Sequence, residues 1–310
     1  MMSALDNVLI VGCGDIGVRT AQLLKQRGGS VSALARSEES AARLRSYGIE
    51  PILGNLDDAD SLAVLPTAGK LVLYMAPPPG GGPIDGRIRN FCAAVDKANA
   101  PKRVVYISTS GVYGDCGGAM VTEATPINPQ TSRAQRRADA EQTLTVWGEQ
   151  YSVPIVILRV TGIYGPGRLP LARVQQGHPV LCEAESPPTN RIHADDLATV
   201  CVAAAEKAAA GDIYNISDGQ PGTMTQYFSA IAALLDLPQP QQISMEEAKQ
   251  VMNPMMLSYL TESRRMDSKK MFEKLGVTLQ YPNLESGLKQ VVAQLEQPDM
   301  GYFGSIGHNK

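Results

Sequence analysis

Three glycines near the start of the chain have the spacing of a phosphate-binding turn. Residues 12–17 are GCGDIG and follow directly after an apolar run, residues 8–11. We expect Gly12 to allow a tight turn, Gly14 to let the backbone approach a pyrophosphate, and Gly17 to let the next helix pack closely on the strand. Because the glycines follow a strand and open a helix, they predict a dinucleotide site. The alternative is a glycine-rich turn that binds nothing.

The end of the second expected strand, residues 31–35, indicates which dinucleotide is bound. An NAD site offers an acidic residue to the ribose hydroxyls at this point, but here the chain continues with Arg36 and Ser37. A guanidinium beside a hydroxyl suits a 2′-phosphate. The sequence therefore predicts a preference for NADP(H) over NAD(H). Alternatively, Arg36 is only a solvated loop charge.

Two further strand ends complete the predicted cofactor site. Residues 50–57 form a third strand with its exit loop, and residues 70–76 form a fourth, which enters the proline- and glycine-rich residues 77–83. In an open parallel sheet, ligands bind beyond the carboxyl ends of the strands. The predicted cofactor-binding residues are Gly12, Gly14, Asp15, Ile16, Gly17, Arg36, Ser37, Asn55, Leu56, Ala76 and Pro77.

The elements around these residues alternate between strand and helix. A helix is expected near residues 85–100, a fifth strand over 103–108 and a sixth over 154–160. Such alternation predicts an α/β fold with a parallel, doubly wound Rossmann sheet.

Composition excludes several functional classes. The chain has 310 residues with 28 basic and 31 acidic side chains, which leaves no electrostatic footprint for nucleic acid. No apolar stretch approaches the ~18 residues that a membrane span needs, and the first residues do not resemble a signal peptide. We therefore expect a cytoplasmic protein. The five scattered cysteines and three histidines predict neither disulfides nor a metal site.

Four motifs in order resemble those of the extended short-chain dehydrogenases/reductases, the NAD-dependent epimerase/dehydratase family. They are residues 107–114 (ISTSGVYG), 158–167 (LRVTGIYGPG), 190–198 (NRIHADDLA) and 214–216 (YNI). The resemblance implies an atypical member of this family, because the family's catalytic residues are replaced in this sequence.

The resemblance also implies a division into domains. An NAD(P)-binding Rossmann domain would occupy residues 1–165 and about 190–218. A smaller, C-terminal substrate-binding domain would comprise about 166–189 and 219–300, and residues 301–310 would be a mobile tail. The substrate would then lie in the cleft between the domains.

The family's chemistry uses a tyrosine and a lysine four residues later, and both are missing here. Arg133 and Arg137 stand in their places. The absence does not depend on the alignment, since residues 114–150 contain no tyrosine and residues 103–206 no lysine. Arginine cannot donate a proton as tyrosine does, because its pKa lies above ~12.

The remaining candidate catalytic residues are Thr109, Ser110, Arg133 and Arg137. The two hydroxyls resemble the family's group that hydrogen-bonds a substrate carbonyl, although they could simply cap the next turn. The two arginines, one helical turn apart, could hold a phosphate or carboxylate. Alternatively they are surface charges, with Arg137 and Glu141 forming an exposed pair that contributes ~0.3–0.5 kcal/mol.

Other conspicuous side chains favour structural roles. Tyr113 and Tyr164 are candidate substitute proton donors, but packing is the favoured interpretation for both. His193 with Asp195 and Asp196 has the form of a catalytic dyad in a segment that is structural in the family. Core packing is expected for Met252, Met255, Met256 and Trp147.

Two functional hypotheses remain open. The first is an NADP-dependent oxidoreductase or epimerase-like enzyme with altered catalytic residues, acting on a sugar-like or other small carbonyl substrate. The second is a protein that binds NADP(H) without turnover, as a sensor or regulator. For partners we expect a small-molecule substrate, with an anionic one as an option, and neither nucleic acid nor membrane; a homodimer is compatible with the sequence.

Overall fold

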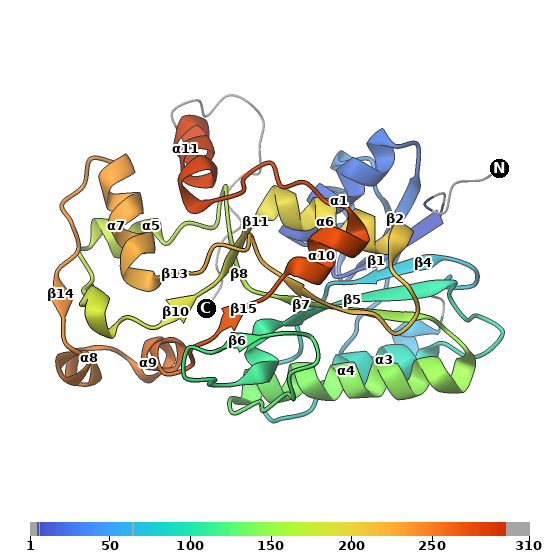
Figure 1. Cartoon of the computed structure of the whole chain (residues 1–310). Coiled ribbons are helices and arrows are strands. Elements are labelled where there is room, and N and C mark those ends of the chain that lie inside the picture. Colours follow the sequence, from blue (N-terminus) through green and yellow to red (C-terminus); the bar gives the residue numbers. More distant parts are fainter. Residues whose placement is uncertain (1–4, 6, 64, 296–310) are drawn as a thin grey trace.

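The computed structural model describes residues 5, 7–63 and 65–295, so the predicted tail 301–310 lies outside the described residues (Figure 1). Its centre is a seven-stranded sheet whose paired strands are all parallel, in the order β12-β7-β5-β4-β1-β2-β3. These strands are β1 (Asn7–Val11), β2 (Ser30–Ala35), β3 (Glu50–Leu53), β4 (Leu71–Tyr74), β5 (Arg103–Thr109), β7 (Ile155–Val160) and β12 (Ile213–Ile216). The predicted doubly wound α/β Rossmann fold is confirmed.

Helices cover both faces of the sheet (Figure 1). Val8 and Ile10 of β1 pack into one core, and Leu9 and Val11 pack into the other, as the two-residue period of a strand requires. The first core is closed by α1 (Asp15–Gln26), α2 (Glu38–Ser46), α6 (Ala194–Lys207) and α10 (Lys269–Leu275). The second is closed by α3 (Gly86–Ala94), α4 (Ser132–Tyr151) and the short 3-10 helix η1 (Asp60–Leu62).

The strand order reverses at β1, and this creates the crevice in which a ligand can bind. β1 pairs with β2 on one side and with β4 on the other, and Val11 lies level with Tyr74. The turn after β1 therefore meets the loop after β4 at the carboxyl edge of the sheet. In open α/β sheets this reversal point is where dinucleotides bind.

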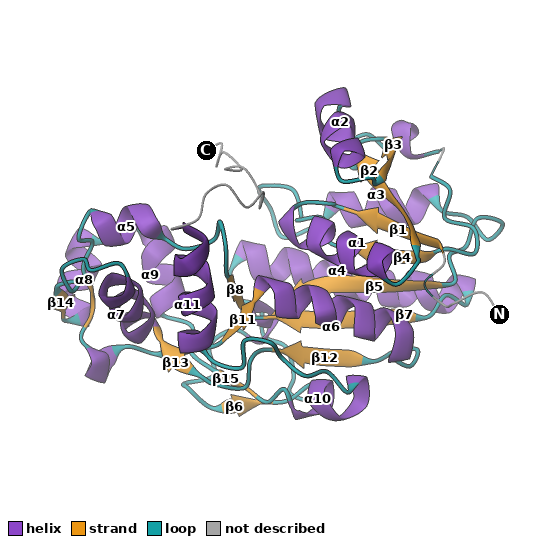
Figure 2. Cartoon of the chain, turned by 90° about the horizontal axis from the view of Figure 1, so that it is seen from above, coloured by secondary structure: helices purple, strands orange, loops and turns teal. Residues whose placement is uncertain are grey.

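A smaller lobe lies beyond this edge (Figure 2). Short two-stranded sheets lie in this lobe or flank it. They are β8 (Gly162–Tyr164) with β11 (Arg191–His193), β9 (Val180–Leu181) with β14 (Gln242–Ile243), β10 (Pro188–Thr189) with β13 (Gly222–Thr223), and β6 (Met120–Val121) with β15 (Arg265–Met266). Its helices are α5 (Leu171–Gln175), α7 (Met224–Leu234), α8 (Met245–Val251), α9 (Pro254–Leu260) and α11 (Leu284–Leu295). Two 3-10 turns complete the chain: η2 (Ser110–Tyr113) follows β5, and η3 (Glu183–Glu185) follows β9. The lobe has a core of its own, built around Tyr164, Phe228, Ile231 and Leu288.

Helix α3 is shorter than the sequence predicted. It begins after Asp85, whose carboxylate accepts hydrogen bonds from the backbone N–H groups of Arg87 and Ile88, but it ends at Ala94 instead of reaching residue 100. Beyond it the Asp96 side chain accepts a hydrogen bond from the backbone N–H of Asn99, at 2.9 Å. Such a local side-chain bond satisfies the backbone in a turn and competes with continuation of the helix.

The described residues lack three features that would have pointed to other functions. Within them no helix is long and apolar enough to cross a membrane. All five cysteines are free thiols. No group of three histidine, cysteine or acidic side chains in the described part could hold a metal ion.

His193 is a buried structural residue at the start of α6. Its Nδ1 accepts a hydrogen bond from the backbone N–H of Asp195 at 3.3 Å, and so caps the helix. The ring lies edge-on to Tyr164 and 4.0 Å from the ring centre of Tyr281. Burial lowers the pKa of His193 to about 4, although the Asp195 carboxylate opposes the shift.

The low pKa of His193 predicts a loss of stability in acid. In the unfolded chain histidine binds a proton below about pH 6.5, whereas folded His193 stays neutral down to about pH 4. Its contribution is therefore complete above the unfolded pKa and is lost as the pH falls from about 6.5 to about 4, by up to about 3 kcal/mol.

Urea unfolding at a series of pH values would measure this loss. The variant His193→Asn keeps a capping acceptor but cannot titrate, so its stability should fall less over that interval than that of the wild type. Identical pH dependence in the two proteins would contradict the assignment.

Candidate functional site

The turn after β1 has the geometry expected of the three glycines. Gly12 has a φ of +91°, and a Cβ there would lie 2.3 Å from the backbone nitrogen of Ala76. At Gly17 a Cβ would meet Cys13 and Ile10 at 3.2–3.3 Å, so helix and strand are in close contact. At Gly14 a Cβ would meet nothing within 4 Å. The backbone is therefore open to solvent at the one glycine that the sequence assigned to phosphate approach.

The N-terminus of α1 is available to an anion. No side chain caps it, and Gly14 stands at the N-cap position. The first N–H groups of a helix have no intrahelical partner, and the helix dipole favours negative charge there. Ile16 is buried in this first turn and contributes only its backbone to that surface.

Asp15 has a role that the sequence did not reveal. Its carboxylate accepts a hydrogen bond from Arg19 at 2.7 Å and another from Arg168, which follows β8. Arg19 also donates to Asp195 at the start of α6. Asp15 thus connects the glycine-rich turn to the segment that enters the smaller lobe, and its charge is neutralised by two guanidinium groups.

Arg36, Ser37 and Asn55 come together at the other end of the predicted cofactor site. They line a shallow cavity of about 350 Å³ beyond β2 and β3. Ser37 is also the N-cap of α2, accepting from the backbone N–H of Ser40. Arg43 of the same helix donates to the carbonyl of Cys13 at 3.0 Å. Arg43 was not predicted, because only the fold brings α2 back to the glycine-rich turn.

The remaining predicted cofactor residues act through their backbones. Leu56 is buried, and its carbonyl accepts from Asn90 at 2.9 Å. The backbone nitrogen of Ala76 faces Gly12, and the carbonyl of Pro77 accepts from Arg87 at 3.0 Å.

Arg87 also pairs with Asp57 through two hydrogen bonds of 2.7 Å. These contacts hold the loops after β3 and β4 beside the crevice.

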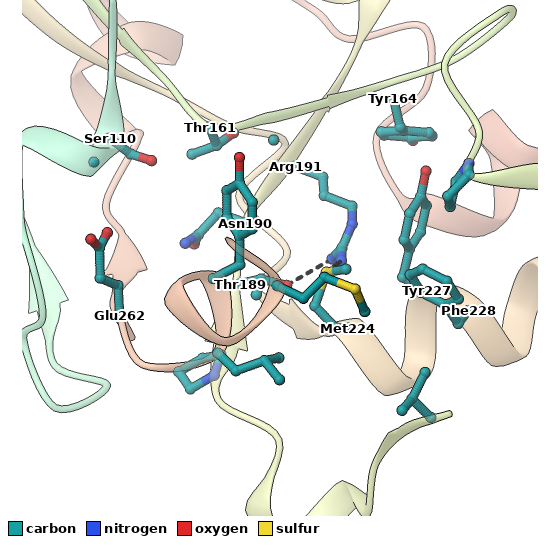
Figure 3. A pocket seen from close by; sticks show the side chains of 18 of the residues that line it. Ser110, Thr161, Tyr164, Thr189, Asn190, Arg191, Met224, Tyr227, Phe228 and Glu262 are labelled. Atoms are coloured by element: carbon teal, nitrogen blue, oxygen red, sulfur yellow. Dashed lines mark hydrogen bonds between the residues drawn. The ribbon is translucent and has the colours of Figure 1, made fainter. Parts of the chain in front are cut away.

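A larger cavity of about 800 Å³ opens where the sheet meets the smaller lobe (Figure 3). On the sheet side it is lined by Thr109, Ser110 and Arg133. On the lobe side its walls include segments of β8, α5, β9, β10, β11, α7 and α9. Residues distant in sequence therefore form one chamber at the carboxyl end of β5.

The hydroxyls of Thr109 and Ser110 are the two candidates for holding a substrate carbonyl. Thr109 Oγ1 accepts from the backbone N–H of Gly111 at 3.2 Å, so it caps the 3-10 turn η2 as the structural alternative supposed. It also lines the large cavity. Strand pairing sets Thr109 opposite Val160, which places Ser110 and Thr161 at adjacent strand ends. Ser110 and Thr161 both line the cavity, but the Thr161 hydroxyl already donates to the carbonyl of Ile216 at 2.9 Å.

Arg133 reaches across the cavity to the smaller lobe. Its guanidinium donates to Ser258 Oγ at 3.1 Å and lies 4.1 Å from the ring centre of Tyr259, both on α9. Among the described residues no carboxylate pairs with it within 4.0 Å. Arg133 therefore presents to the cavity a positive charge without an acidic partner among these residues.

Arg137 does not form the exposed pair with Glu141 that was considered as an alternative. It donates to the carbonyl of Ile107 at 2.9 Å, to Tyr106 Oη at 3.1 Å and to the carbonyl of Ala76 at 3.4 Å. Glu141 is buried and bonds instead to Ser108 and Arg159. Arg137 thus joins the ends of β4 and β5 and is committed to the fold.

The tyrosines and methionines divide between core and cavity. Tyr113 is buried and donates to Asn215 Oδ1 at 2.7 Å. The Tyr164 hydroxyl donates to the carbonyl of Asn283 at 3.2 Å, and burial raises its pKa. Both tyrosines are packed, as the sequence favoured, but Tyr164 also lines the large cavity.

Trp147 is also in the core. Met252 packs against the small core of Leu181, Ile243 and Ala248, as expected, and both Met252 and Met256 also line the cavity. The structure does not describe the side chain of Met255.

Cavity residues that the sequence analysis missed come mainly from the smaller lobe. They are Arg168, Arg173, Arg191, Tyr227, Tyr259 and Arg264. Of these residues only Arg191 lies within one of the four family motifs, residues 190–198, so no motif pointed to the others. Five arginines line the cavity against one acid, Glu262, which pairs with Arg264 at 3.3 Å. The chamber is therefore electropositive.

Residues 88–217 match the model of the NAD dependent epimerase/dehydratase family, and residues 8–68 match the TrkA-N domain. A functionally unknown conserved protein from Silicibacter pomeroyi DSS is 30% identical; the similarity covers 93% of this chain and 99% of that one, with a TM-score of 0.78. The chain belongs to the NAD dependent epimerase/dehydratase family.

Two curated relatives show how wide the likeness is. Protein YeeZ of Escherichia coli (strain K12) is 27% identical over 290 residues, which span 90% of this chain and 97% of YeeZ. The 4-hydroxy-2-methyl-3-oxo-4-farnesyl-3,4-dihydroquinoline-1-oxide ketoreductase of Stigmatella aurantiaca is 25% identical over 238 residues, 71% of this chain and 70% of that protein. The open backbone at Gly14 and the uncapped helix behind it fit the NAD(P) that the family binds.

Gly14 provides a direct test of the cofactor site. The replacement Gly14→Val adds a side chain into open space, so the chain should fold normally, but the branched carbons would occupy the volume that the pyrophosphate needs. Calorimetric titration should show no NADPH binding, with an unchanged thermal unfolding midpoint. Unaltered affinity would mean that the cofactor binds elsewhere.

Proposed function

We propose that this protein is an NADP(H)-dependent oxidoreductase or epimerase-like enzyme acting on a small carbonyl compound bound in the 800 Å³ cavity. The observation that supports this most strongly is the position of that cavity. It begins at Thr109 and Ser110, at the end of β5, two strands away from the glycine-rich turn in the same sheet. A substrate there and a cofactor along the sheet edge would meet at the hydroxyls.

The proposed chemistry uses the residues that line this meeting point. Bound NADPH would supply hydride. Ser110 is positioned to hold a carbonyl oxygen by a hydrogen bond, and Arg133 offers a fixed positive charge to the oxygen as negative charge develops on it. A preorganised cation of this kind stabilises the transition state without giving up a proton.

A proton donor, where the reaction needs one, would come from the smaller lobe. We infer that Tyr259 is the candidate, because its ring lies against Arg133 at the cavity wall and the Tyr164 hydroxyl is already committed to Asn283. A phenol is thus present in the cavity, carried by α9 instead of α4.

The alternative function is an NADP(H)-binding protein without turnover. One observation favours it: Arg137, in the place of the family's lysine, is bonded to two backbone carbonyls and to Tyr106 and does not line the cavity. The group that normally assists the proton donor is therefore employed by the fold. Turnover assays separate the two hypotheses.

Cofactor preference is the first prediction from this proposal. Arg36 should bind the 2′-phosphate through one or two charge-assisted hydrogen bonds, contributing about 1.5–3 kcal/mol each, so NADPH should bind at least about tenfold more tightly than NADH. In Arg36→Ala most of this ratio should disappear. Calorimetry with both cofactors measures it, with Arg45→Ala, an exposed α2 arginine outside the cavity, as control. Equal affinities in the wild type would refute the preference.

Substrate choice is the second prediction from this proposal. Loss of a positioned acid typically costs about 10²–10⁴-fold in rate. Ordinary nucleotide-sugar substrates of epimerases and dehydratases should therefore show trace turnover at most. A panel of small aldehydes and ketones, followed by NADPH absorbance, should contain substrates whose reduction slows in Tyr259→Phe and Arg133→Met. Robust nucleotide-sugar turnover that survives both replacements would contradict the proposed chemistry, and complete inactivity would favour the alternative.

A further inference from the structure

Two arginines at the far side of the large cavity stand on neighbouring aromatic rings of α7. The guanidinium carbon of Arg191 lies 4.2 Å from the ring centre of Tyr227, and that of Arg173 lies 4.7 Å from the ring centre of Phe228. The two rings are themselves 5.9 Å apart. Figure 3 places Arg191, Tyr227 and Phe228 on one side of the cavity and Ser110 on the other.

Neither arginine has an acidic partner in the described part of the chain. Arg191 is only 7% exposed, and its guanidinium donates to Thr189 Oγ1 at 2.9 Å and to the carbonyl of Thr223 at 3.4 Å, beside the sulfur of Met224 at 3.2 Å. All of these partners are neutral. The Nε of Arg173 is buried without any hydrogen-bond partner.

The other charged groups nearby do not compensate these two cations. Arg168 pairs with Asp15, and Arg264 pairs with Glu262, so these two carboxylates are already engaged. Asp218 is buried close enough to influence Arg191, yet it forms no ion pair with it within 4.0 Å. Burial raises the pKa of Asp218 to about 6, so its negative charge is lost only in mildly acidic solution.

A buried cation without a counter-ion is unfavourable. Removing a charge from water costs several kcal/mol unless a partner of opposite sign replaces the solvent. Accordingly, burial lowers the pKa of both Arg173 and Arg191. Guanidinium groups stacked on aromatic rings keep their edge N–H groups free for a planar anion. The two guanidinium groups therefore favour an anion in the cavity beside them.

We propose that Arg173 and Arg191 form a subsite for an anionic group, a carboxylate or a phosphate ester, at the end of the substrate opposite its carbonyl. The cavity lining between these ends is mixed, with the polar side chains of Thr161, Thr189 and Asn190 beside apolar ones such as Met224. The ligand is thus an organic anion that extends from Ser110 to the two arginines. This inference rests on the proposed function only in that it takes the cavity to be the substrate site.

Calorimetry with matched probes tests the subsite without knowledge of the natural substrate. The probes are 4-phenylbutanoate, its neutral analogue 4-phenylbutanamide, and phenyl phosphate, titrated into the protein with and without NADPH. The wild type should bind at least one anion about tenfold or more tightly than the amide. The stronger of the two anions identifies whether carboxylate or phosphate is preferred.

Three variants locate the binding. Arg191→Met and Arg173→Met keep the side-chain length but remove the charge, and each should weaken the anion at least about fivefold while leaving the amide unchanged. Arg89→Met is the matched control, because Arg89 is an exposed arginine on α3 that pairs with Asp139 outside the cavity. If Arg191→Met does not fold, Arg173→Met carries the test alone.

The outcomes separate this inference from the proposed function. Equal affinity for anion and amide, no binding of either anion at millimolar concentration, or anion binding that survives both replacements would overturn the subsite. NADPH binding and carbonyl reduction are measured separately. Their absence beside an intact anion preference would reject the enzyme proposal and leave the subsite standing.

Discussion

The buried ion pair between Glu141 and Arg159 is the interaction on which the geometry of the candidate site depends. Both side chains are 6% exposed, and the guanidinium donates to the carboxylate at 2.8 and 3.2 Å while Ser108 donates to it at 2.5 Å. The pair fixes α4 against β5 and β7. Since α4 carries Arg133 and Arg137, it also sets their distance from the strand ends. Removal of one partner from such a pair costs about 3–5 kcal/mol.

The same network extends through the family motifs. Arg159 donates to Tyr113 Oη at 3.0 Å, Tyr113 donates to Asn215, and Asn215 in turn donates to the carbonyls of Val121 and Asp267. The polar residues of three motifs therefore form one hydrogen-bonded chain inside the fold. These motif residues therefore serve the architecture of the fold.

The features that depend on residues close together in the chain could be predicted from the sequence. The strands and the turn at Gly12, Gly14 and Gly17 follow from hydrophobic runs and from local backbone requirements, and the structure has them where they were expected. The early end of α3 and the true partners of Arg137 were not predicted, because a local turn and long-range carbonyl contacts decide them.

The cavity was the least predictable part. Arg173, Arg191 and Tyr259 come from separate segments and share no spacing, so only the folded chain brings them together.

Arg133 and Arg137, one turn apart on α4, use their charges differently. Arg137 is bonded to the ends of β4 and β5, so its charge is directed to backbone carbonyls. The contacts of Arg133, which are Ser258 and the ring of Tyr259, leave its charge uncompensated. With Arg173 and Arg191, the cavity therefore presents three guanidinium groups that lack acidic partners among the described residues. A chamber charged in this way favours ligands and transition states that carry negative charge on oxygen. Arg133 thus adds to the attraction of the cavity for anions at the end where Ser110 lies.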